Sequence, residues 1–113
     1  MDSILTSIKK LLGIEEDYTH FDQDIIIYIN SAFMGLHQLG VGPEEGFEIT
    51  DATDEWDDFV SGRTDLGGIK TYVYLKVRLI FDPPQAGYVI TAIQDQIKEL
   101  EWRLNVQVEG VVI

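Results

Sequence analysis

The sequence predicts a mainly α-helical protein: a small single-domain bundle of about four to five helices, with a long acidic loop, possibly a short strand, and an extended C-terminal tail. Three observations predict this class. Apolar residues recur at intervals of three and four along most of the chain. Glycines or prolines stand where these runs end. The 113 residues, 45% of them hydrophobic, suffice for one domain around one core. We expect residues 1–105 to form the helical domain and residues 106–113 an extended or flexible tail.

Two helices are predicted in the first forty residues. The first ends at Gly13, a C-cap glycine, and its apolar stripe is Ile4, Leu5, Ile8, Leu11 and Leu12. The second has Asp22 and Asp24 at its front, where negative charge suits the helix dipole, and Gly40 closes it. Its stripe is Ile25, Ile26, Ile29, Ala32, Phe33, Leu36 and Leu39.

A glycine-rich, acidic segment follows and is predicted to be mostly loop. It reads V-G-P-E-E-G-F-E-I-T-D-A-T-D-E-W-D-D-F-V-S-G. We expect a short extended piece at Phe47–Thr50 and a short helix near Asp54–Val60. Thr53 or Asp54 would cap that helix, and its apolar side would be Trp56, Phe59 and Val60.

The stretch from Ile69 to Phe81 is compatible with a strand or a helix. Apolar residues at every second position favour a strand. A helical stripe is present as well, at Ile69, Tyr72, Val73, Lys76, Val77 and Ile80. A strand of this length would exceed the usual ~5–6 residues, and no comparable partner strand is nearby. Helix is therefore favoured, although β-branched residues lower its propensity, and the strand stays open as an alternative.

A long last helix is predicted after the Pro83-Pro84 break, over Gln85–Asn105. Its stripe is Val89, Ala92, Ile93, Gln96, Ile97, Leu100 and Leu104. The candidate core of the whole bundle comprises Ile29, Phe33, Leu36, Val73, Val77, Ile93, Ile97, Leu100, Trp102 and Leu104.

Composition and motifs exclude most kinds of chemistry. The net charge of −12 argues against binding to a nucleic-acid backbone or an anionic membrane, since both require cations. There is no cysteine, no phosphate-binding glycine motif and no zinc-binding motif. His20 and His37 lack a second ligand at metal spacing, and the D-A-T-D-E-W-D-D run does not keep the spacing of a calcium loop. We expect no enzymatic activity, no cofactor and no metal.

No membrane span or secretory signal is expected either. No segment approaches the ~18 apolar residues that cross a bilayer. The first residues lack a basic region followed by an apolar core. A cytoplasmic origin is the default expectation.

Protein contacts remain the expected function, and two segments are candidates. The apolar tail would be a liability if exposed, so it is expected either to add a strand to a neighbouring subunit or to be a flexible end. The acidic loop could rearrange on assembly. The candidate interface residues are Phe47, Ile49, Asp54, Asp57, Asp58, Val106, Val108, Val111, Val112 and Ile113.

The chain resembles a known family over nearly its whole length. The aromatic-rich segment that ends in F-D-P-P is followed by I-Q-D-Q-I-K-E-L-E-W-R-L-N, and the start carries S-I-L-T-S-I-K-K-L-L-G-I and D-Q-D-I-I-I-Y-I-N-S-A. This pattern resembles the head–tail connector proteins of long-tailed bacteriophages and prophages, and E-W-R-L-N is its most specific part. The resemblance implies a helical bundle, with residues 69–81 helical, and no enzymatic activity.

The resemblance also implies partners. Copies of the chain would form a dodecameric ring beneath the portal protein, extend the DNA channel and hold a downstream head-completion or tail protein. The chain would be made in the host cytoplasm and reside in the virion at the head–tail junction. Acidic side chains lining the ring would repel DNA phosphates and let the genome slide without specific binding. The rival interpretation is a small acidic regulatory protein that docks on a basic partner surface.

Overall fold

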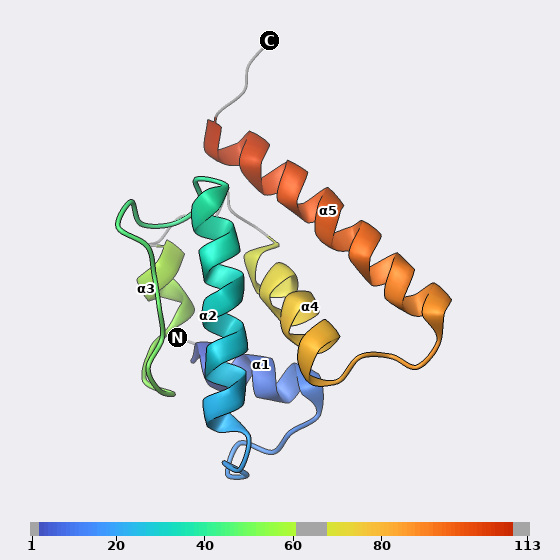
Figure 1. Cartoon of the computed structure of the whole chain (residues 1–113). Helices are drawn as coiled ribbons and strands as arrows, with labels where there is room; N and C mark the ends of the chain where they lie inside the picture. Colours follow the sequence, from blue (N-terminus) through green and yellow to red (C-terminus); the bar gives the residue numbers. More distant parts are fainter. Residues whose placement is uncertain (1–2, 61–67, 110–113) are drawn as a thin grey trace.

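The computed structural model describes residues 3–60 and 68–109 of the chain. Five helices appear in this part, and its β-structure is confined to an isolated antiparallel bridge between Ser3 and Glu55. The helices are α1 (Ile4–Leu12), α2 (Asp22–Gln38), α3 (Trp56–Val60), α4 (Ile69–Phe81) and α5 (Gly87–Glu109), as Figure 1 shows. The predicted mainly α-helical class is confirmed.

The ends of α1 and α2 follow local rules that the sequence displays. The Ser3 side chain accepts a hydrogen bond from the backbone N–H of Thr6 at 3.2 Å, which caps the start of α1. Gly13 ends α1 in the left-handed conformation, with φ of 83°. Gly40, with φ of 82°, follows α2 in the same conformation. Both helices therefore lie where they were predicted.

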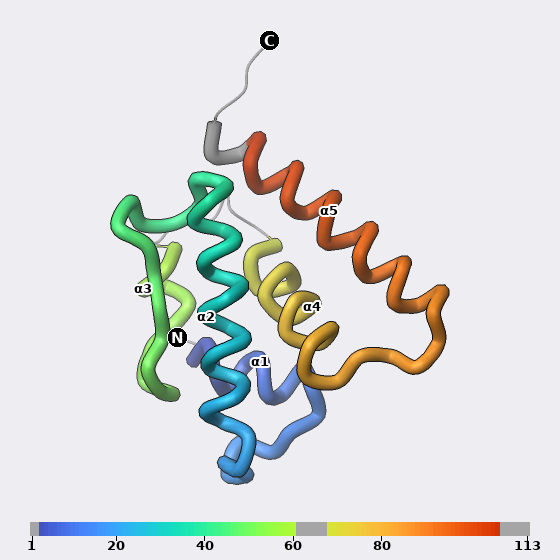
Figure 2. Tube along the Cα trace, in the orientation of Figure 1, coloured from blue at the N-terminus to red at the C-terminus, as the bar shows by residue number. Residues whose placement is uncertain are grey.

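The stretch with two interpretations is a helix, α4, and it is the centre of the bundle. Helices α1, α2 and α5 all pack against it, and Figure 2 shows α1 running across the lower ends of α2 and α4. Tyr72, Val73 and Val77 are fully buried, and Leu75 is nearly so. Because α4 has neighbours on several sides, its apolar residues occupy more than one face, which produces the alternation that imitates a strand.

The acidic loop contains the predicted short helix, which starts later than expected and is not capped by Asp54. Helix α3 begins at Trp56, and the Asp54 carboxylate does not cap it. That carboxylate instead accepts a hydrogen bond from the backbone N–H of Thr50 at 2.8 Å, closing a turn that precedes the helix. The piece Phe47–Thr50 is extended without a partner strand, because the side chain of Asn30 takes the place of one.

Helix α5 runs four residues further than predicted, to Glu109. Residues 106–109, which were assigned to an extended tail, are therefore helical, since the helix has no proline or glycine to stop it before Gly110. The extended conformation predicted for these four residues is therefore wrong for the single chain, and adding them as a strand to a neighbouring subunit would require this end of α5 to unfold. The rest of the predicted tail, residues 110–113, lies outside the described residues.

Most of the predicted core is buried, with one clear exception. The buried members are Ile29, Phe33, Leu36, Val73, Val77, Ile97 and Leu104. Ile93 and Leu100 are partly buried and pack against that core. Trp102, by contrast, is 66% exposed, so its assignment to the core is wrong. It lies five residues after Ile97, about 140° around the helix from the packed face.

Candidate interaction surfaces

Charge is distributed unevenly over the bundle. Every Asp, Glu, Lys or Arg between residues 11 and 62 is acidic, and this range includes α2, α3 and the loop between them. Helices α4 and α5 hold a group of cations: Lys70, Lys76, Arg78, Lys98 and Arg103. The molecule therefore has a purely acidic side and a side of mixed charge.

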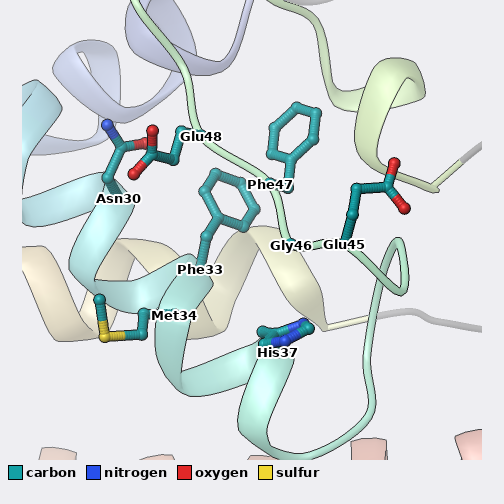
Figure 3. Close-up of a pocket in the computed structure, with 8 residues that line it drawn as sticks. All are labelled: Asn30, Phe33, Met34, His37, Glu45, Gly46, Phe47 and Glu48. Carbon is teal, nitrogen blue, oxygen red and sulfur yellow. The ribbon is translucent and has the colours of Figure 1, made fainter.

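The acidic side contains a groove between α2 and the segment 45–48, with a volume of about 330 Å³ (Figure 3). It is lined by Asn30, Phe33, Met34, His37, Glu45, Gly46, Phe47 and Glu48. The α2 residues among them recur at intervals of three and four, so they share one face of the helix. The groove is thus apolar at its base and acidic at its rim.

Aromatic packing forms the base of the groove. Phe33 is buried, and its ring lies edge-on to that of Phe47 with the centroids 5.1 Å apart. Phe59 of α3 packs against both rings. Gly42 approaches Phe59 so closely that a Cβ there would lie 2.4 Å from the ring, and its φ of 94° also requires glycine. These contacts hold the loop against α2.

Asn30 fixes the loop by a pair of hydrogen bonds to the backbone of Ile49. Its Nδ2 donates to the carbonyl oxygen at 3.0 Å, and its Oδ1 accepts from the N–H at 2.8 Å. Ile49 is consequently buried, with 1% of its surface exposed, and it cannot serve as the contact residue that the sequence suggested. Its role is to anchor the segment that carries the acidic rim.

A second surface is the outer face of α5. Residues at intervals of four and three along this face are Tyr88, Ala92, Asp95, Glu99, Trp102 and Val106. Tyr88 is 81% exposed and Trp102 66% exposed. The opposite face packs on α4 through Ile97 and Leu104, and the Tyr72 hydroxyl donates to Glu101 Oε2 at 2.9 Å. Helix α5 is thus covered on its inner face, and its outer face exposes two aromatic side chains together with the acids Asp95 and Glu99.

The remaining predicted contact residues are spread over the molecule. Phe47 is half-buried in the groove, Asp57 and Asp58 are exposed on α3, and Val106 is half-buried on α5. The side chain of Val108, together with Val111, Val112 and Ile113, lies outside the described residues. The loop candidates Phe47 and Ile49 are brought together with Asn30 and Phe33, whereas Asp54 serves the fold of the loop.

Several exposed apolar residues were missed by sequence reasoning. They are Leu11, Tyr18, Ile27, Met34, Ile80 and Tyr88. The sequence does indicate two of them. Ile27 and Met34 lie seven residues apart, so they share one face of α2, and that face is outside the predicted core stripe.

Two titratable groups, Tyr72 and Asp51, have pKa values shifted by contacts within the fold. Burial raises the pKa of Tyr72, and its hydrogen bond to Glu101 raises it further. Hydrogen bonds from the side chain and backbone of Thr53 lower the pKa of Asp51. Within residues 3–60 and 68–109, no group of three or more His, Asp or Glu side chains could hold a metal ion. In the same ranges, no helix combines the length and apolar character of a membrane span.

These features define a small helical protein with an acidic groove and a helix face that exposes aromatic side chains. A family model described as "Phage connector protein" matches residues 4–111, nearly the whole chain. The chain therefore belongs to this family of phage head–tail connectors, and its role is of the structural, connector type. No curated protein and no solved structure matches the chain.

Proposed function

We propose that this chain forms a ring beneath the portal that extends the DNA channel and joins the capsid to the tail. The observation that carries the proposal is the family match over residues 4–111. A ring of identical subunits needs two different contact surfaces on each copy. The groove on the acidic side and the outer face of α5 are two such surfaces, which supports the proposal.

The charge of the chain supports a role around DNA. At −12 per copy, a ring would carry strong negative potential, and its lumen would repel the phosphates of the genome. A channel of this kind guides DNA without binding it. The partners proposed are the portal protein on one side and a downstream head-completion or tail protein on the other, with twelve copies in the ring.

Assembly on the portal tests this function. The purified chain is measured by light scattering over a range of concentrations, alone and with the portal oligomer of the same phage, and the mixture is imaged by electron microscopy. We expect a ring coaxial with the portal. A chain that stays monomeric at every concentration and does not bind the portal would overturn the proposal. Binding to a basic protein instead would favour the rival regulatory function.

The acidic lumen has its own test, on an exposed acid of α3. Asp57→Lys is expected to slow DNA ejection and reduce infectivity, while the matched Asp57→Asn change has a smaller effect. Asp54 and Asp58, the other two acids suggested by the sequence, are unsuitable because their carboxylates accept hydrogen bonds from the backbone N–H groups of Thr50 and Glu55. Normal ejection with the lysine variant would show that α3 does not line the channel.

A further inference from the structure

The two candidate surfaces lie on opposite sides of one molecule. In Figure 1, α4 lies between α2 and the middle of α5, while the C-terminal end of α5 reaches the upper end of α2, where Asn105 binds the Leu39 carbonyl. Trp102 is on the face of α5 turned away from the bundle, and the groove opens beside residues 45–48, on the side of α2 away from α4, so the two surfaces face different directions. Surfaces in this arrangement can meet only between copies, head to tail, and such a contact generates a ring when the rotation from copy to copy closes.

The shapes of the two surfaces are complementary. Trp102 stands out from α5 as a large exposed aromatic side chain, and tryptophan is the residue most enriched at the energetic centre of protein interfaces. The groove offers about 330 Å³ over an aromatic base, with Met34 at its edge, 62% exposed. Met side chains adapt to aromatic partners and contact them favourably. The groove can therefore accept one aromatic ring.

Their charges are complementary as well. Lys98 is exposed one turn before Trp102 on α5, whereas the neighbouring Arg103 is held by Glu99 at 2.8 Å. Glu45 and Glu48 are exposed on the rim of the groove. A chain of net charge −12 is repelled by its own copies unless its acidic side meets its cations. Around Trp102 the α5 face carries Lys98, the Glu99–Arg103 pair and Asp95, so its charges balance, whereas the groove rim carries exposed acids. Contact between the groove and the α5 face therefore brings Lys98 to the acidic rim, whereas contact between two grooves brings acids against acids.

We propose that Trp102 of one copy seats in the groove between α2 and residues 45–48 of the next copy, with Lys98 facing Glu45 or Glu48. This inference rests on the proposed ring and names the contact that closes it. The occupant of the groove is thus a second copy of the same chain. The outer face of α5 is exposed in the single chain because its partner is the adjacent subunit.

Site-directed crosslinking tests the contact, and the absence of cysteine from the chain makes the background clean. In the variant Lys98→Cys with Glu45→Cys, Trp102 and Met34 stay in place. A short bismaleimide is added to this variant assembled on the portal oligomer. We expect a ladder of covalent multimers, whereas each single-cysteine variant stays uncrosslinked. The matched control pairs Glu45→Cys with Lys10→Cys, another exposed lysine, on α1, and should give no ladder.

Two results would overturn the inference while leaving the ring intact. One is an assembled ring in which the Lys98/Glu45 pair crosslinks no better than the control pair. The other is a dimer from Lys98→Cys alone, which would indicate that α5 meets α5. Failure of the wild-type chain to assemble on the portal would instead refute the proposed function, and the subunit contact with it.

A second variant measures how much Trp102 contributes to the contact between copies. Trp102→Ala is expected to raise the concentration needed for assembly about tenfold or more, while Trp102→Phe keeps much of the contact. Because Trp102 is exposed in the single chain, circular dichroism should show both variants folded. Unchanged assembly of the Trp102→Ala variant would exclude the groove as its seat.

Discussion

Lys9 is a cation in the interior of the bundle. Its side chain is 3% exposed, and its Nζ lies 2.8 Å from Asp22 Oδ1 and donates to the carbonyl of Glu16 at 3.0 Å. It thereby ties α1 to the connection before α2 and to the first residue of that helix. The adjacent Lys10 is exposed. Two neighbouring lysines therefore have unequal consequences for stability.

We predict that Lys9→Met lowers the free energy of unfolding by about 3 kcal/mol, because Asp22 loses the partner of a largely buried ion pair. Lys10→Met is the matched control and should change it by less than about 0.5 kcal/mol. Urea denaturation followed by circular dichroism measures both. Equal effects of the two substitutions would contradict the structural role of Lys9.

Tyr72 is fully buried at the contact between α4 and α5, with its hydroxyl bonded to Glu101. Gly35 of α2 makes room for that hydroxyl, since a Cβ at this position would lie 3.1 Å from it. We predict that Tyr72→Phe lowers the free energy of unfolding by about 1.5 kcal/mol, the scale of a hydrogen bond to a charged group. Tyr88→Phe, with an 81% exposed ring on α5, is the control, and urea denaturation is the measurement.

The raised pKa of Tyr72 also predicts a pH dependence. A folded-state pKa above the unfolded value means that the neutral hydroxyl stabilises the fold below pH about 10. That contribution is lost as the pH rises from the unfolded pKa toward the folded one. We expect the free energy of unfolding to fall above pH about 10 in the wild type, and to fall less in Tyr72→Phe. Parallel curves for the two proteins would be contrary to this account.

At the scale of elements, the segment 45–50 depends on one side chain of α2. Asn30 supplies both hydrogen bonds that a partner strand would give Ile49. We predict that Asn30→Ala lowers the free energy of unfolding by about 2–3 kcal/mol, since it leaves a buried N–H and a buried carbonyl of Ile49 unpaired. Asn30→Asp should cost a similar amount, because a carboxylate accepts from the N–H but cannot donate to the carbonyl.

Hydrogen exchange at the Ile49 amide measures the same effect locally. Its rate is expected to rise in both Asn30 variants, with little change in the α1 amides under conditions that keep the bundle folded. Unchanged protection at Ile49 would mean that aromatic packing alone holds the segment.

Helix α5 is attached to the bundle by its inner face only. Leu104 is fully buried there, Trp102 is exposed on the other side, and Asn105 Nδ2 donates to the Leu39 carbonyl at 3.0 Å. We predict that Leu104→Ala lowers the free energy of unfolding by about 3 kcal/mol, and Trp102→Ala by less than about 0.5 kcal/mol. Thermal denaturation of the two variants provides the comparison. A larger loss of unfolding free energy from Trp102→Ala would show that the Trp102 side chain packs in the core.

At the scale of the whole molecule, the charge of −12 is a source of self-repulsion. Salt screens such repulsion, so we predict that the melting temperature of the single chain rises when NaCl is increased from about 20 mM to about 500 mM. Assembly should respond in the opposite sense, since the proposed contact between Lys98 and the groove rim is weakened by the same screening. Light scattering and circular dichroism over one salt series measure the two trends.

A single chain whose melting temperature falls with salt would show that ion pairs such as Lys9–Asp22 outweigh the net charge. The control for assembly is Lys98→Gln, which should remove part of the salt dependence along with part of the affinity.

Much of this architecture could be predicted from short stretches of sequence. The ends of α1 and α2 follow from Ser3, Gly13 and Gly40, because caps and left-handed glycines are local in the chain. The groove could not be predicted in this way. It depends on hydrogen bonds between the Asn30 side chain and the backbone of Ile49, nineteen residues away. The apolar periodicity of neither segment predicts such a pairing of a side chain with a backbone.

The sequence by itself determined the helical class, the positions of most helices, the acidic character and the membership of the connector family. These properties depend on near neighbours, on composition, or on a pattern that extends along the whole chain. Only the tertiary structure decided that Lys9 and Ile49 are buried and that Trp102 is exposed. Whether a side chain meets the core depends on where other helices stand around it, and α5 has a neighbour on only one of the two faces that could bury an apolar group.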